Sequence, residues 1–234
     1  VSAIVGPQLA IYTEKLFPSV PFAGAFLMFV PIGLAAAGVM SFMNLPKLTD
    51  HAATGAVSAR PLSEIVFTQR FMTGMFCGIS SYCLMTFMMT GAPLAMVIGC
   101  GFSPEMATLG IQWHVLAMYG PSFLTGRLIA RFGKEKVTAA GLVLTALAAV
   151  VGLNGLSVAH FWIALVLLGV GWNFGFIGAT ALVTDCYRPE ERVKVQAAND
   201  FLVFGSVAIA SFSSGGLLSA GGWTSVNWLV FPPV

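Results

Sequence analysis

Long apolar stretches separated by short polar loops dominate the chain. Residues 71–126 contain one charged side chain, that of Glu105, and residues 137–184 contain none. About 20 apolar residues in a helix that rises 1.5 Å per residue cross the hydrocarbon layer of a bilayer. The pattern therefore predicts membrane-spanning helices at residues 22–43, 71–98, 106–129, 137–156, 161–184 and 199–218. Apolar segments before residue 13 and after residue 222 are interpreted as parts of further spans.

Composition supports the same class of protein. Charged residues make up 9% of the chain and hydrophobic residues 57%, whereas an ordinary soluble domain has roughly a quarter charged residues. The predicted fold is therefore an all-α polytopic transmembrane helical bundle, and the 26 glycines favour close helix contacts in lipid. The lipid bilayer is the expected surrounding and the cell (inner) membrane the expected location. A net charge of +2 gives no reason to expect a nucleic-acid partner.

The distribution of basic residues predicts the orientation of the helices. Residues 44–69 form the longest polar segment, which we interpret as a cytoplasmic linker between residues 1–43 and residues 70–234. If the spans alternate from there, Lys15 is the one basic residue outside, out of 11 in the chain. Such an excess of positive charge marks the cytoplasmic side. The basic residues expected inside are Lys47, Arg60, Arg70, Arg127, Arg131, Lys134, Lys136, Arg188, Arg192 and Lys194.

One basic loop carries a resemblance to a known family. The segment Gly126–Lys136 reads Gly-Arg-Leu-Ile-Ala-Arg-Phe-Gly-Lys-Glu-Lys. It resembles the loop motif Gly-x-Leu-x-Asp-(Arg/Lys)-x-Gly-(Arg/Lys)-(Arg/Lys) of the major facilitator superfamily of secondary transporters. Ala130 stands at the Asp position and Glu135 at the second basic position. These departures fit the weaker copy of the motif, which that family carries between spans eight and nine.

Two further segments resemble the same family. Thr184–Arg192 is similar to the acidic-Pro-Glu-Arg turn at the end of span ten, and Gly6-Pro7 to the end of the span-five motif of antiporters, without its following glycines. The resemblance implies that the chain holds part of span five, spans six to eleven and the start of span twelve. It also implies that the remaining N-terminal helices of the transporter are missing partners, so that this chain should not transport alone.

The resemblance further implies a function. We expect secondary active transport of a small organic solute by alternating access, coupled to protons and without a cofactor. Gly6-Pro7 favours export by antiport. A membrane enzyme is disfavoured because no span contains a cluster of acidic, His or Cys residues that could form a catalytic or metal site. A membrane scaffold or sensor that does not transport, or an inactive fragment, remains the alternative.

The basic loop predicts a gate. Gly126 and Gly133 would permit close backbone approach and a tight reversal. Arg131 would pair with Asp185 at the end of the neighbouring span and hold the helix ends together in one transport state. Lys134 and Arg192 complete the predicted gating set. The alternative is that the loop only anchors the topology.

Polar residues inside the spans predict the substrate site. His114 is the exception among nearly uncharged spans, and it could carry the coupling proton or bind substrate. Trp172 and Asn173 lie at the middle of their span, where an aromatic face beside an amide suits a flat, partly apolar ligand. Packing between helices is the alternative for each. The remaining predicted substrate-binding residues are Gln112, Tyr82 and Thr86.

Overall fold

The computed structural model describes residues 5, 6, 8, 9, 12, 13, 20, 23–43 and 59–234. Contacts divide the chain into two units, residues 1–58 and 59–234. Most of the predicted linker, residues 44–58, lies outside the described residues, as do Pro7 and Lys15. The last part of the linker, from Ala59, belongs to the second unit and contains the short helix α4 (Leu62–Val66).

The first unit contains the span predicted at residues 22–43, in two pieces. α2 covers Ala23–Leu27 and α3 covers Phe29–Ser41. No residue of α3 is buried, and its apolar side chains point in all directions. A helix that is apolar all round is typical of a membrane span.

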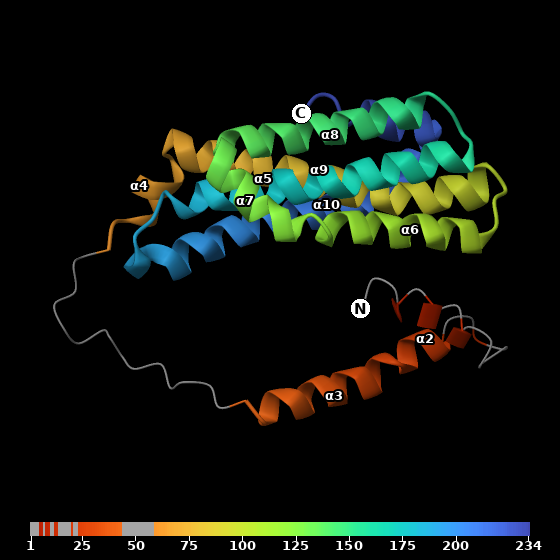
Figure 1. Ribbon diagram of the computed structural model, residues 1–234, viewed down its shortest axis with the longest axis horizontal. Helices are drawn as coiled ribbons and strands as arrows, with labels where there is room; N and C mark the ends of the chain where they lie inside the picture. Colours follow the sequence, from red (N-terminus) through yellow and green to blue (C-terminus); the bar gives the residue numbers. More distant parts are fainter. Residues whose placement is uncertain (1–4, 7, 10–11, 14–19, 21–22, 44–58) are drawn as a thin grey trace. The chain divides into compact units, whose positions relative to one another are not determined.

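The second unit is a bundle of helices (Figure 1). Its predicted spans appear as helices whose ends differ from the predicted ones by up to ten residues. After α4, the elements are α5 (Gln69–Leu94), the π-helical turn η2 (Ala95–Gly99), α6 (Pro104–Tyr119), α7 (Ser122–Phe132), α8 (Lys134–Leu153), α9 (Val158–Thr184), the 3-10 turn η3 (Pro189–Glu191) and α10 (Arg192–Trp228).

Capping residues explain where two of these helices begin. The Thr68 hydroxyl accepts a hydrogen bond from the Phe71 N–H at 3.3 Å, and the Ser103 hydroxyl accepts one from the Met106 N–H at 3.4 Å. Pro104 occupies the first turn of α6, where its missing N–H costs nothing. The caps place both helix starts two residues before the predicted ones.

Two predicted spans differ from the structure. The span at 106–129 is divided into α6 and α7 because Pro121 has no N–H to continue the helical hydrogen bonds. The last helix begins at Arg192 instead of residue 199 and continues across a kink at Gly222, which has φ +67°. Within the described residues, four helical segments have the length and apolarity of a membrane span: Gln69–Gly99, Lys134–Leu153, Val158–Thr184 and Pro189–Trp228.

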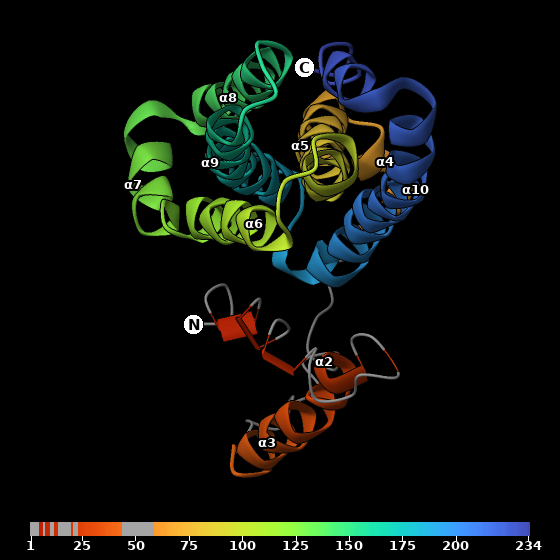
Figure 2. The ribbon, with the colours of Figure 1, turned by 90° about the vertical axis from the view of Figure 1, so that its right-hand side faces the viewer.

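Helix α9 lies at the centre of this unit, in contact with α5, α6 and α8 (Figure 2). Its contact with α8 is backbone against backbone. A Cβ atom added to Gly141 of α8 would lie 2.6 Å from the Gly175 Cα and 2.7 Å from the Gly171 carbonyl oxygen. Small residues allow this approach, which is the common way in which helices associate in lipid.

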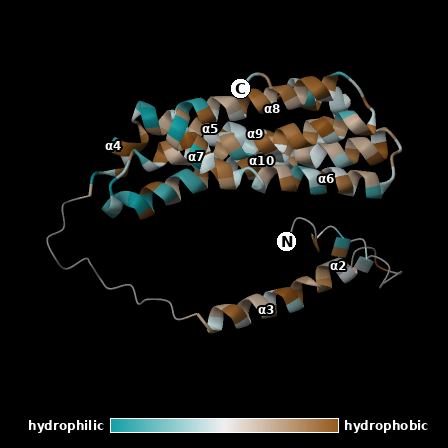
Figure 3. Cartoon of the chain, in the orientation of Figure 1, coloured by the Kyte–Doolittle hydropathy of each residue, from teal (hydrophilic) through white to brown (hydrophobic). Residues whose placement is uncertain are grey.

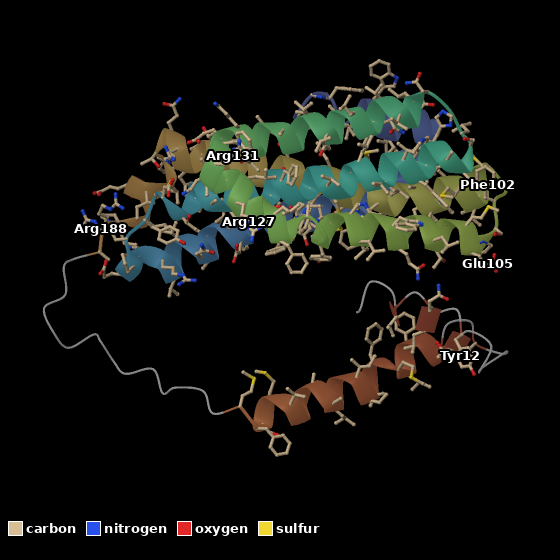
Figure 4. The ribbon with its side chains drawn as sticks, viewed as in Figure 1. Tyr12, Phe102, Glu105, Arg127, Arg131 and Arg188 are labelled. Atoms are coloured by element: carbon tan, nitrogen blue, oxygen red, sulfur yellow. The ribbon has the colours of Figure 1, made fainter. Side chains whose placement is uncertain are left out.

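Polar residues gather at one end of the bundle, where α4 and the start of α10 lie (Figure 3). Arg127, Arg131 and Arg188 lie toward this end, whereas Phe102 and Glu105 lie at the opposite end (Figure 4). We call the first end the charged end. The separation agrees with the charge distribution on which the predicted orientation rests.

Candidate functional site

Five rings from four helices form an aromatic cluster: Tyr82 of α5, Tyr119 of α6, Trp172 and Phe176 of α9, and Phe204 of α10. The Tyr82 ring meets the Trp172, Phe176 and Phe204 rings edge-on, with centroids 5.5, 5.0 and 5.6 Å apart. Trp172 and Phe176 are one helical turn apart and stack at 5.3 Å with an interplanar angle of 15°. These are the distances and orientations that aromatic pairs prefer.

The cluster combines a buried centre with exposed edges. Trp172 is 7% exposed, whereas Tyr119 is 57% and Phe204 49% exposed. The Trp172 indole N–H is buried and donates to no acceptor among the described residues. Buried donors normally have a partner, so an unused one beside exposed rings is a candidate contact for a ligand. Of the predicted site residues, the structure brings Tyr82 and Trp172 together here.

Asn173 has a different environment from its neighbour Trp172. Its Nδ2 donates to the Met118 carbonyl at 2.6 Å and to the Ser122 hydroxyl at 2.7 Å, and its Oδ1 accepts from Thr125 at 2.5 Å. Asn173 is fully buried. The amide therefore joins the break between α6 and α7 to α9. All three hydrogen bonds of its side chain run to the α6–α7 region, and a cavity shared with His114 stays a prediction.

His114 lies in the contact between α6 and α9. It is fully buried, and its Nδ1 lies 2.7 Å from the Leu165 carbonyl oxygen. A carbonyl can only accept, so Nδ1 carries the proton. Nε2 is then an acceptor, and it has no partner among the described residues. The ring thus has one fixed hydrogen bond and one open position.

The other two predicted substrate-binding residues occupy different places. Gln112 is buried on α6, two residues before His114. Thr86 is half-buried on α5, one turn beyond Tyr82, so the two share a helix face. The Thr90 hydroxyl donates to the Thr86 carbonyl at 2.7 Å.

At the charged end, a network around Asp185 joins three helices. The Asp185 carboxylate forms ion pairs with Lys134 of α8 and with Arg70 of α5, the latter at 2.8 Å. Arg70 also pairs with Glu135 at 3.2 Å, and Lys134 donates to the Ala181 carbonyl at 3.0 Å. The Lys134 ammonium, with the Arg70 guanidinium, holds the pKa of Asp185 below its usual value. We call these four charged residues (Arg70, Lys134, Glu135 and Asp185) the Asp185 network.

The predicted partner of Asp185 was Arg131, and this pairing is corrected by the structure. The Arg131 guanidinium lies over the Phe132 ring, 5.3 Å from its centroid. Gly133, with φ +90°, reverses the chain between them, so that Lys134 instead faces α9. No neighbouring segment of the described structure lies close to Gly126, because a Cβ added there would meet nothing within 4 Å. Sequence reasoning missed Arg70, although a lone cation at the start of an apolar run was a usable signal.

A second network at the same end surrounds Glu191, which is fully buried. Its carboxylate accepts hydrogen bonds from Arg60 Nη2 at 2.7 Å and from Arg60 Nε at 2.8 Å, which makes the ion pair bidentate. The backbone N–H groups of Arg60 and Arg188 donate to the same carboxylate at 3.0 and 2.9 Å. Arg60 is therefore attached to the start of α10. Arg192, predicted as a gating residue, is exposed beside this network.

Apolar helices of spanning length, packed through glycines and with ion pairs at one end, define a multi-pass helical membrane protein. Residues 101–234 match the model of the Major Facilitator Superfamily, and the chain belongs to that family.

Several curated proteins are similar to this chain. It is 56% identical over 234 residues to the riboflavin transporter RfnT of Brucella anthropi, covering all of this chain and 58% of RfnT. It is 31% identical over 246 residues to the uncharacterized MFS-type transporter YddS of Bacillus subtilis, covering 96% of this chain and 55% of YddS. The drug efflux pump JefA of Mycobacterium tuberculosis is 31% identical over 123 residues, which is 50% of this chain and 24% of JefA. The chain thus spans little more than half the length of its longer-matching relatives. No solved structure matches it.

Proposed function

We propose that the full-length protein containing this chain transports a flat aromatic heterocycle of the riboflavin class across the cell inner membrane. The observation that carries the proposal is the aromatic cluster. A tricyclic flavin ring binds by stacking on aromatic faces and by hydrogen bonds at its edge. The exposed edges of Tyr119 and Phe204 and the unused Trp172 N–H supply both kinds of contact. The likeness to a protein named a riboflavin transporter supports the same class of substrate.

The polar sugar-alcohol chain of such a ligand needs hydroxyl and amide partners. Thr86 lies one turn from Tyr82 on the same face of α5, and its hydroxyl is a candidate partner. Membrane transporters place substrates at the middle of the bilayer, between two halves. Trp172 is 14 residues from the start of α9 and 12 from its end, which fits that depth.

Alternating access requires the helix ends to separate and rejoin. The Asp185 network holds α5, α8 and α9 together at the charged end, and we infer that this network moves as one body or breaks during the cycle. We further propose that transport is coupled to protons and that His114 takes up the proton at Nε2, its open position. The prediction of export rests on Gly6-Pro7, of which Pro7 lies outside the described residues.

Riboflavin binding and flux by the full-length protein test the proposal. Purified protein should quench flavin fluorescence. Cells that express the protein should lose riboflavin faster than control cells if it exports, and accumulate riboflavin if it imports. Trp172→Ala should weaken binding about tenfold, the scale of losing one aromatic stacking contact. Trp172→Phe, which keeps a ring but loses the N–H, should be intermediate.

Trp113→Ala is the matched control, because Trp113 is 51% exposed and makes none of the ring contacts of the cluster. Equal riboflavin affinity in Trp172→Ala and Trp113→Ala would refute the site. Riboflavin binding without any flux in cells would favour the alternative of a sensor that does not transport.

A further inference from the structure

Three consecutive charged residues at the start of α8 face three different surroundings. Lys134 pairs with Asp185, and Glu135 pairs with Arg70. Lys136 lines an apolar groove on the outside of the bundle. The first two residues belong to the Asp185 network, whereas neither the predicted gate nor the proposed substrate site uses Lys136.

The groove has a volume of about 220 Å³ and lies between α7, α8 and α9. Five of its six lining side chains are apolar, and Lys136 is the sixth. The apolar ones are Leu128, Phe132, Val137, Ala140 and Phe174. A second groove on the bundle surface, lined by Trp113, Trp162, Ile163, Val166 and Leu167, has no charged side chain in its lining.

A second cation lies against one wall of the groove. The Arg131 guanidinium covers the Phe132 ring, and Phe132 lines the groove. Among the described residues, neither Arg131 nor Lys136 takes part in an ion pair, and the nearest carboxylate in sequence, Glu135, is paired with Arg70. Arg127 lies one turn before Arg131 on the same helix, and both lie toward the charged end (Figure 4). The groove thus carries positive charge without a protein partner.

We propose that this groove binds an anionic phospholipid of the cytoplasmic leaflet. An acyl chain lies along the apolar walls, and the phosphate contacts the Lys136 ammonium and the Arg131 guanidinium. The apolar walls distinguish the ligand from free phosphate, and the two unpaired cations favour an anionic over a zwitterionic headgroup. The predicted orientation puts the charged end on the cytoplasmic side, where anionic lipids are enriched.

Bound lipid would hold α7 against α8 at the reversal that positions Lys134. This step follows from the chain geometry, because Gly133 alone separates the two helices. The lipid site lies on the outer face of the bundle, so lipid binding there does not depend on which substrate the aromatic cluster takes.

Lipid retention tests the inference on the purified full-length protein. The protein is placed in nanodiscs of mixed phosphatidylglycerol and phosphatidylcholine, and the lipids that remain bound are counted by native mass spectrometry. Wild type should retain phosphatidylglycerol preferentially. Lys136→Gln should lower this preference about fivefold, and Lys136→Gln with Arg131→Gln about 30-fold, because each basic group near an anionic surface contributes about a fivefold effect. Inorganic phosphate at millimolar concentration should not displace the lipid.

Two further variants separate a groove from a general surface charge. Arg188→Gln removes an exposed cation at the same end but outside the groove, and it should leave retention unchanged. Ala140→Leu keeps every charge but fills the groove, and it should reduce retention as strongly as Lys136→Gln. Size-exclusion elution and helix content check that each variant is folded. Equal loss in Arg188→Gln, or full retention in Ala140→Leu or in the double variant, would overturn the inference.

Discussion

Lys134, the first residue of α8, forms an ion pair with Asp185, the residue that ends α9. The same carboxylate also binds Arg70 in the first turn of α5, so that a single aspartate joins three helices. An anion at a helix C-terminus is unfavourable for the helix dipole unless cations accompany it, and here two do. The pairing gives the loop motif a physical role at the charged end.

A double-mutant cycle tests this pairing. Lys134→Ala and Asp185→Asn should show a coupling free energy of about 1 kcal/mol or less, because both side chains are partly exposed and solvent screens the pair. Arg131→Ala combined with Asp185→Asn is the matched comparison and should show no coupling, since Arg131 lies on the Phe132 ring. Thermal unfolding of the purified protein measures both cycles. A larger coupling free energy for Arg131 with Asp185 than for Lys134 with Asp185 would favour the predicted Arg131–Asp185 pair.

The pH dependence of stability follows from the same carboxylate. The pKa of Asp185 is lowered in the folded protein, mainly by Lys134. Folding therefore gains stability from this group above the ordinary aspartate pKa of about 3.9, and loses it as the pH falls through the lower folded pKa. The difference in melting temperature between wild type and Asp185→Asn should be constant above about pH 5 and shrink below about pH 4. A difference that grew on acidification would contradict the assigned partners.

The helices were predictable because bilayer thickness alone dictates apolar runs of this length. The break inside the span at 106–129 also has a visible cause in Pro121, yet apolarity continues through it and masks the break. The early start of α10 was missed because polarity, and not apolarity, misled the prediction there. Its first turns are polar because they extend beyond the predicted span, so hydropathy excludes them although they are helical.

The partners of polar residues were not predictable, because they depend on how each helix is rotated about its axis. Trp172 and Asn173 are adjacent in sequence but point about 100° apart on a helix. Trp172 therefore packs in the aromatic cluster, whereas Asn173 forms hydrogen bonds at the α6–α7 break. Thr125 and Ser122 gave a partial signal as a polar pair beside a proline. The hydrophobic pattern of one helix does not predict how the neighbouring helix is rotated about its axis.

Gly141 should be the most sensitive glycine of the α8–α9 contact. Gly141→Ala forces a Cβ against the backbone of Gly175, where no side chain can move aside, and should destabilise the protein by about 1–3 kcal/mol. Gly215→Ala is the control, because a Cβ there meets nothing within 4 Å. The melting temperatures of the two variants in detergent measure the difference. Equal melting temperatures would mean that α8 and α9 are farther apart than in this structure.

The orientation of the chain can be tested with its own cysteines. Cys100 follows η2 at the end opposite the charged end, and Cys186 follows α9 at the charged end. With the charged end inside, a membrane-impermeant thiol reagent added to whole cells should modify Cys100 faster than Cys186. Variants that keep one of the two thiols, with the others replaced by Ser, separate the signals. Preferential modification of Cys186 would invert the orientation and move the proposed lipid site to the outer leaflet.

His114 provides the test of proton coupling. In the full-length protein, His114→Asn keeps a donor near the Nδ1 position for the Leu165 carbonyl but cannot take up a proton at Nε2. If His114 carries the coupling proton, this variant should fold normally and lose the dependence of transport on pH between about 5 and 8. His160→Asn is the matched control, because the His160 ring bonds Ser157 near the start of α9, away from the α6–α9 contact. Flux of the proposed substrate into proteoliposomes, measured across that pH range, separates the two roles. An unchanged pH profile with a lowered melting temperature would assign His114 to helix packing alone.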